Sequence, residues 1–342
     1  MKRVMVWAVG LVVVAALGWG LWWQALASGQ RAAIEAWFAD RRQAGWQAEL
    51  GAITVEGFPL RLDRELLAIQ LADPRAGWSW TLPRVGVKGE AIAPTRFDLV
   101  MPDHHSIAIP GQRVDIRHRR LDGQLSLVPG PRLGWRDGIV QGEAVAIASQ
   151  AGWEAGAEAL SAQLVERAPG TAPANSYTMT LDATGVDLPR RLLDRIDPAD
   201  LLSTRVEELS FAGSAALTAP LDLRTIENGE IDLTAATIRK ARLSWGELAV
   251  DARGTFDVTA DGYPQGEITL TLSNWRQMIV IARNSGAVEP GLIDAAEQAL
   301  QFVALIAGDG DNIDVPLKLS CGKVRIGPFA IADAPRLAEA GK

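Results

Sequence analysis

The chain has almost none of the residues from which metal centres, disulfide frameworks and acid–base sites are built. Its 342 residues include one cysteine, Cys321, which excludes an internal disulfide and any multi-cysteine zinc or iron–sulfur site. It has only three histidines, His104, His105 and His118. Adjacent residues of a strand point to opposite faces, so His104 and His105 are poorly placed to share a metal ion. We therefore expect neither a metal nor a cofactor.

The motifs of common enzyme classes are also missing. The sequence contains no Gly-x-x-x-x-Gly-Lys-Ser/Thr phosphate loop, no Gly-x-Ser-x-Gly elbow and no His-Glu-x-x-His pair. Cys321 shares the parity of Val315, Leu317 and Leu319, so we expect a buried small apolar residue rather than a nucleophile. These observations predict a protein that is not an enzyme.

Basic charge is too scarce for a nucleic-acid-binding surface. The chain carries 34 basic and 41 acidic residues, for a net charge of −7, whereas a duplex is normally bound by a basic surface. Nucleic acid is therefore not an expected partner. The hydrophobic share of 48% and the charged share of 22% are typical of a folded protein.

One long apolar run is present, and it lies at the N-terminus. No charged side chain occurs between Val4 and Trp23, and twenty helical residues span about 30 Å, the thickness of a bilayer core. Trp22 and Trp23 end the run, where indole rings favour the headgroup level. The basic start, Lys2-Arg3, predicts a cytoplasmic tip at residues 1–3, a transmembrane anchor at 4–23 and a periplasmic body. This topology is that of a single-pass protein of a bacterial inner membrane.

A cleaved signal peptide is the alternative interpretation of this segment. Ala25-Leu26-Ala27 before Ser28 has the small-x-small form of a cleavage site. A signal core of about 7–15 apolar residues is shorter than this run, and the tryptophan pair favours an uncleaved anchor. The sequence leaves cleavage after Ala27 open, and both interpretations place the body outside the cytoplasm.

The body alternates apolar and polar residues with period two. The clearest runs are residues 177–182, 231–234, 256–259, 268–273 and 315–321. Such alternation places the apolar side chains on one face of a half-buried strand, as is typical of antiparallel sheets. Asp122-Gly123, Asn228-Gly229 and Asp261-Gly262 fit tight hairpin turns. The predicted fold is mainly β, with curved or open amphipathic antiparallel sheets, a few packed helices and one N-terminal transmembrane helix.

Three further helices are expected outside the membrane anchor. A connector over residues 30–50 places Ile34, Trp37 and Phe38 on one face, which packs either on the sheet or against the membrane surface. The other helices cover 189–204, interrupted at Asp197-Pro198, and 290–307, ended by Gly308.

The loop at residues 167–175 is a candidate boundary between two β-rich halves, 51–166 and 175–337. The same loop also fits a long hairpin connection within one domain. The sequence leaves both the number of domains and the oligomeric state open.

Trp78 and Trp80 are the candidate site residues. They are two positions apart, so they project from the same face of a strand. Such a pair either lines an apolar groove that accepts acyl chains or fills the core.

Several glycine–proline turns carry a family resemblance. They are Gly57-Phe58-Pro59-Leu60-Arg61, Asp314-Val315-Pro316-Leu317, Gly327-Pro328-Phe329 and Pro335-Arg336-Leu337. With the basic anchor, the chain resembles an uncharacterised, membrane-anchored envelope family of alphaproteobacteria. It also distantly resembles the AsmA-like envelope proteins, which implies one N-terminal anchor and an extended β-groove linked to lipid traffic.

Two functions fit these observations. The first is an anchored periplasmic β-rich protein that binds lipid or another amphiphile in cell-envelope biogenesis. The second is a scaffold or assembly factor that binds another envelope protein, without enzymatic activity. An apolar sheet face that helices leave uncovered would favour the first.

Overall fold

The protein consists of two compact units. The computed structural model describes residues 2–130, 132–168, 170–229, 231–307 and 311–338. The first unit comprises Met1–Ser126 and Ser149–Ala151, and the second comprises Leu127–Ala148 and Gly152–Lys342. The loop 167–175 lies inside the second unit, where it connects two antiparallel neighbours as a hairpin loop. The division into halves at this loop stays a sequence-based prediction.

The first unit combines one long helix with short antiparallel strands. Strands β1 to β3 pair in chain order, β3 pairs with both β4 and β5, β5 pairs with β6, and β4 pairs with β7. The last residues of β7 belong to the second unit. The elements are α1 (Lys2–Gln43), β1 (Gln47–Glu56), β2 (Asp63–Asp73), β3 (Trp78–Glu90), β4 (Ala93–Val100), β5 (His104–Ile109), β6 (Gln112–Arg117) and β7 (Arg120–Val128).

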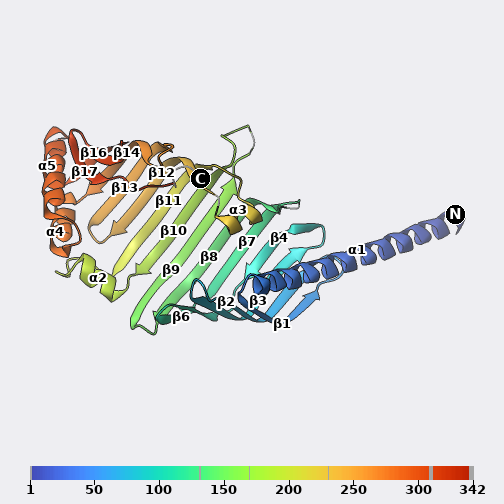
Figure 1. Cartoon of the computed structure of the whole chain (residues 1–342). Helices are drawn as coiled ribbons and strands as arrows, with labels where there is room; N and C mark the ends of the chain where they lie inside the picture. Colours follow the sequence, from blue (N-terminus) through green and yellow to red (C-terminus); the bar gives the residue numbers. More distant parts are fainter. Residues whose placement is uncertain (1, 131, 169, 230, 308–310, 339–342) are drawn as a thin grey trace. The chain divides into compact units, whose positions relative to one another are not determined.

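Helix α1 is one continuous helix of 42 residues, drawn in blue in Figure 1. It contains a segment long and apolar enough to cross a membrane, within Leu11–Gln43. The connector expected over residues 30–50 is the second part of this helix and is shorter than expected. It ends at Gln43, because Gly45 adopts a φ of +91° and the chain then enters β1. Met1 and the side chains of Lys2 and Arg3 lie outside the part that the structure describes.

The apolar face of the connector packs on the sheet. Phe38 is buried with Ala48, Ile69 and Leu82, and Ile34 and Trp37 pack against the same cluster. The first of the two interpretations of this face is therefore correct. The end of α1 is fixed on strands β1 to β3 of the first unit.

The second unit is built from long neighbouring strands. From β9 to β17 each strand pairs antiparallel with the next, and β8 lies beside β9. The strands are β8 (Gly134–Ser149), β9 (Trp153–Glu166), β10 (Ser176–Asp187), β11 (Arg205–Leu217), β12 (Leu233–Trp245), β13 (Leu248–Val258), β14 (Pro264–Ser273), β15 (Asn312–Ser320), β16 (Lys323–Ile326) and β17 (Phe329–Asp333). The predicted mainly antiparallel β fold is confirmed.

Four helices accompany these strands: α2 (Arg190–Ile196), α3 (Leu223–Asn228), α4 (Trp275–Ser285) and α5 (Pro290–Ala307). Helix α5 has the predicted bounds, and Gly308, expected to end it, lies outside the described residues. The helix predicted over 189–204 is only seven residues long, because it ends before Asp197-Pro198. Helices α3 and α4 were not predicted from the sequence.

Two of the three predicted hairpin turns are wrong. Only Asp261-Gly262 joins consecutive strands, β13 and β14. Asp122-Gly123 lies inside β7, and Asn228-Gly229 ends α3, with Gly229 at a φ of +66°. Cys321 is exposed, contrary to the prediction, because β15 ends at Ser320 and Cys321 starts the turn that follows.

Candidate functional site

One face of the second unit's sheet is apolar across several strands. On this face Met179 of β10 lies opposite Leu164 of β9 and Gly213 of β11, and Leu181 lies opposite Phe211. The row of paired residues that contains Met179 continues from Gly213 to Ile238 of β12, whose partner in β13 is Gly254. The antiparallel register therefore aligns the apolar positions of successive strands into one surface.

Among the described residues, no helix packs over part of this surface. Met179 and Leu181 are 44% and 42% exposed although they lie in the interior of a long strand. The neighbouring large side chains are half-buried. We call this surface the open apolar face, and its side chains are Leu160, Leu164, Met179, Leu181, Phe211, Ile238, Phe256 and Ile268. Exposed apolar surfaces are commonly places where a protein, a membrane or a ligand binds, so this face is the candidate functional site.

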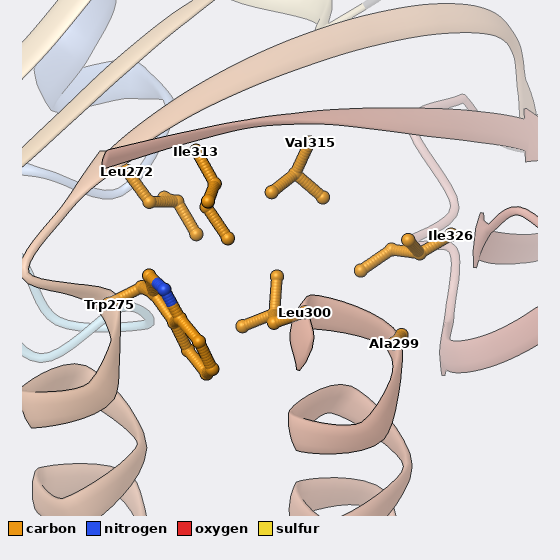
Figure 2. Close-up of a cluster of buried hydrophobic side chains, with 7 residues drawn as sticks. All are labelled: Leu272, Trp275, Ala299, Leu300, Ile313, Val315 and Ile326. Atoms are coloured by element: carbon orange, nitrogen blue, oxygen red, sulfur yellow. The ribbon is translucent and has the colours of Figure 1, made fainter. Parts of the chain in front are cut away.

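Helices α4 and α5 cover the other end of the same face. Figure 2 shows Leu300 of α5 pointing toward Leu272, Ile313 and Val315 of the sheet, and the Trp275 ring of α4 lying between the two helices. Trp275, Ile313 and Val315 are each 1% exposed. The apolar face is thus a closed core under α4 and α5 and an open surface from β9 to the positions of Phe256 in β13 and Ile268 in β14.

An apolar cavity of about 310 Å³ lies where the covered part of the second unit meets α2 and α4. Trp245 is buried there with Leu193 and Val206, and its indole Nε1 donates a hydrogen bond of 2.8 Å to the carbonyl of Ser203. The residues that line the cavity include Ile196, Leu202, Leu243, Val250, Met278 and Ile281. This volume is at the lower end of the range of small-molecule sites.

The opposite face of the sheet is polar. Arg242 pairs with Asp251 at 2.9 Å and with Glu208 at 3.6 Å, across β11, β12 and β13. Arg253 lies 3.8 Å from Asp314 of β15. Because this face is polar and partly solvated, the sheet does not need a second apolar layer there.

Trp78 and Trp80 belong to the first unit, whereas the open apolar face belongs to the second. Trp80 packs against the cluster of Phe38 and Leu82. Trp78 makes an edge-to-face contact with Trp46, with ring centroids 5.2 Å apart. Both rings thus take part in packing at the end of α1. Their role in a groove stays a prediction.

The neighbouring histidines point to opposite faces of β5, as expected. His104 is exposed and lies 3.2 Å from the Asp115 carboxylate, whereas His105 is buried. The His105 ring lies 5.8 Å from that of His118 and 6.0 Å from that of Trp80. Burial is the main cause that lowers the pKa of His105. Among the described residues, no group of three or more histidine, cysteine, aspartate or glutamate side chains is arranged to hold a metal ion.

A larger cavity, of about 830 Å³, lies between α1 and β1 in the first unit. Arg31, Glu35 and Arg42 line one side, and Phe38 and Trp46 contribute apolar surface. Arg31 also lies 3.7 Å from Glu35 and donates a hydrogen bond to the carbonyl of Ile53. Arg42 donates a hydrogen bond of 3.2 Å to the carbonyl of Phe38. An acyl chain in this cavity would lie against charged side chains, so the cavity is a less suitable acyl-chain site than the open apolar face.

The alternation of Met179 and Leu181 is evident in the sequence, but their exposure is not. Alternation shows that side chains share a face, and it does not show whether another element covers that face. One signal was available: many amphipathic strands were predicted with very few helices to cover them.

These features define a class of protein: an amphipathic antiparallel β protein with a candidate membrane helix at its N-terminus and an apolar sheet face that is only partly covered. The chain belongs to a family described as an uncharacterised protein conserved in bacteria (DUF2125), whose model matches residues 23–335. No curated protein and no solved structure matches it.

Proposed function

We propose that this protein is a single-pass, membrane-anchored periplasmic protein that binds the acyl chains of a lipid or another amphiphile. The proposed site is the open apolar face of the second unit, and no catalytic chemistry is assigned to it. The observation that carries the proposal is the exposure of Met179 and Leu181 in the interior of an apolar sheet face. An acyl chain lying on these side chains would bury their apolar surface, and each Å² removed from water would stabilise the complex by about 25 cal/mol.

The composition of the face suits a ligand that is apolar along its length. Alanine and glycine positions alternate with large ones, as at Gly213 between Met179 and Ile238. Such a surface offers shape and apolar contact with few polar groups that fix an orientation. The distant resemblance to AsmA-like envelope proteins, and the resemblance to a membrane-anchored envelope family of alphaproteobacteria, support the same proposal.

The test is the amount of lipid that stays with the full chain after gentle detergent extraction, measured by native mass spectrometry. We expect bound lipid on the wild type and a loss of about tenfold or more for Leu181→Glu, because a carboxylate facing an acyl chain costs more than the roughly 1.4 kcal/mol of one tenfold step. Thr180→Glu places the same charge on the polar face of the same strand and is expected to keep the lipid. A wild type without lipid, or equal lipid on the two variants, contradicts the proposal.

A second candidate function, a scaffold for another envelope protein, is favoured by a different surface. Phe302 and Leu305 on α5 are 55% and 81% exposed. Phe302, Pro328 and Phe329 line an apolar cavity of about 320 Å³. A defined protein crosslinked to the full chain in membranes and lost in Phe302→Glu, with Leu181→Glu unaffected, would support the scaffold instead of lipid binding.

A further inference from the structure

An exposed apolar tip lies beside the membrane helix in the first unit. Phe58, Leu60 and Ile92 are 58%, 65% and 72% exposed, and we call these three side chains the apolar tip. Phe58 and Leu60 belong to the loop between β1 and β2, and Ile92 belongs to the turn between β3 and β4. The carbonyl of Leu60 accepts a hydrogen bond of 2.9 Å from the amide of Ala91, so the loop and the turn are neighbours.

Side chains of α1 fix this loop at a defined level of the helix. The indole Nε1 of Trp19 donates a hydrogen bond of 2.7 Å to the carbonyl of Pro59. The Nε1 of Trp23 donates one of the same length to the carbonyl of Arg61. The Phe58 ring lies edge-to-face on Trp23, with centroids 5.5 Å apart. The loop therefore runs alongside one turn of α1.

That turn is the end of the predicted membrane span, residues 4–23. Trp19 and Trp23 are four residues apart, which corresponds to about 6 Å along the helix. Phe58 lies within this turn, since one of its ring carbons lies 4.0 Å from the position that a Cβ of Gly20 would take. The side chains of α1 on the N-terminal side of this turn, such as Leu17 at 64% exposed, present apolar surface outward.

We infer that the apolar tip inserts into the membrane leaflet that surrounds the end of α1. Large apolar side chains beside a membrane helix, at the level where its tryptophans lie, meet the boundary between headgroups and acyl chains. The lipid bilayer is the occupant that the structure favours, because the surface of the tip is continuous with that of the helix. The first unit is then held to the membrane at two points, α1 and the tip. The inference requires α1 to span the membrane, and it is independent of lipid binding to the open apolar face.

The test uses single-cysteine variants of the full chain in lipid vesicles, each labelled with a polarity-sensitive fluorophore. Cys321→Ser removes the native exposed thiol. The variant Ile92→Cys then probes the tip, and Ile109→Cys is the matched control, because Ile109 is an exposed isoleucine at the end of β5 in the same unit. Leu17→Cys reports on the span itself.

We expect lipids that carry a doxyl quencher near the headgroup end of the acyl chain to quench the Ile92 probe more than lipids that carry it near the methyl end. This order follows from insertion to about 5–10 Å. The Ile109 probe should keep its emission, and the Leu17 probe should be quenched. If Ile92 emits like Ile109 while Leu17 is quenched, the tip does not insert although α1 spans the membrane. If Leu17 is not quenched, both the span and this inference are wrong.

Discussion

The indole Nε1 of Trp23 donates a hydrogen bond of 2.7 Å to the backbone carbonyl of Arg61. This contact joins the end of the apolar N-terminal run to the loop that leaves β1. It explains why a residue that the sequence presents as a membrane anchor also belongs to the folded first unit.

Replacing Trp23 with phenylalanine should loosen the loop. The variant Trp23→Phe loses this hydrogen bond, at a cost of about 1 kcal/mol or a factor of about five in the opening equilibrium. We expect faster hydrogen exchange at Arg61 and Leu62, whose amides donate to Gly57 and Gly89. Trp22→Phe is the control, because Trp22 is 53% exposed. Equal exchange in the two variants would show that the hydrogen bond does not hold the loop.

Truncating the core under α5 should destabilise the second unit. Leu300 is 7% exposed and packs in the cluster of Trp275 and Ile313, so Leu300→Ala should cost about 2–5 kcal/mol. On the same helix, Leu305 is 81% exposed, and Leu305→Ala should stay within about 0.5 kcal/mol. Urea unfolding of the full chain in detergent, followed by circular dichroism, measures both. A small effect at Leu300 would mean that α5 is not packed on the sheet.

Gly213 should resist the addition of even one methyl group. A Cβ there would lie 2.5 Å from the carbonyl oxygen of Thr237 and 2.8 Å from the Phe211 ring. We expect Gly213→Ala to lower the free energy of unfolding by about 1–3 kcal/mol. Gly291, in the first turn of α5, has no atom within 4 Å of its Cβ position, so Gly291→Ala should be neutral or slightly stabilising. The same urea experiment separates the two, and equal behaviour would refute the close approach of β11 and β12.

The first unit should lose stability in mild acid because of His105. Burial, and to a lesser extent the neighbouring His118 and His104, lower the pKa of His105 below its ordinary value of 6.5. As the pH falls, the unfolded chain therefore binds a proton at this histidine near pH 6.5, whereas the folded chain binds it only at lower pH. The stability that the neutral His105 contributes to the folded state is thus complete above pH 6.5 and is lost as the pH falls below 6.5. We expect the urea midpoint to fall between about pH 8 and pH 5, and His105→Phe to flatten the decrease. An NMR titration of His105 with a midpoint at or above 6.5 would contradict the assignment.

Period-two alternation was sufficient to predict the long strands, because it depends only on neighbouring side chains. Residues 177–182 and 268–273 lie in β10 and β14 as expected. The end of α2 before Pro198 could also be predicted from the local sequence, because proline has no amide proton to donate to a helical hydrogen bond. Helix α4 was missed because periodicity does not distinguish a helix from a strand in a short apolar run such as residues 278–282.

The open apolar face could not be predicted from the sequence as the strands were. Trp78 and Trp80 were candidate groove residues because they are large and share a face of a strand. In the structure they pack near the end of α1. Met179 and Leu181 read like any other half-buried pair. Only the placement of α2, α4 and α5 decides which part of the apolar face is covered.

By itself, the sequence determined the apolar N-terminal helix, the antiparallel strands and the two chemically different faces of the sheet, since each depends on residues that are neighbours along the chain. The tertiary structure alone decided where the apolar face stays open and that Phe58 and Leu60 lie beside Trp19 and Trp23. Both depend on contacts between segments far apart in sequence, and no local periodicity encodes such contacts.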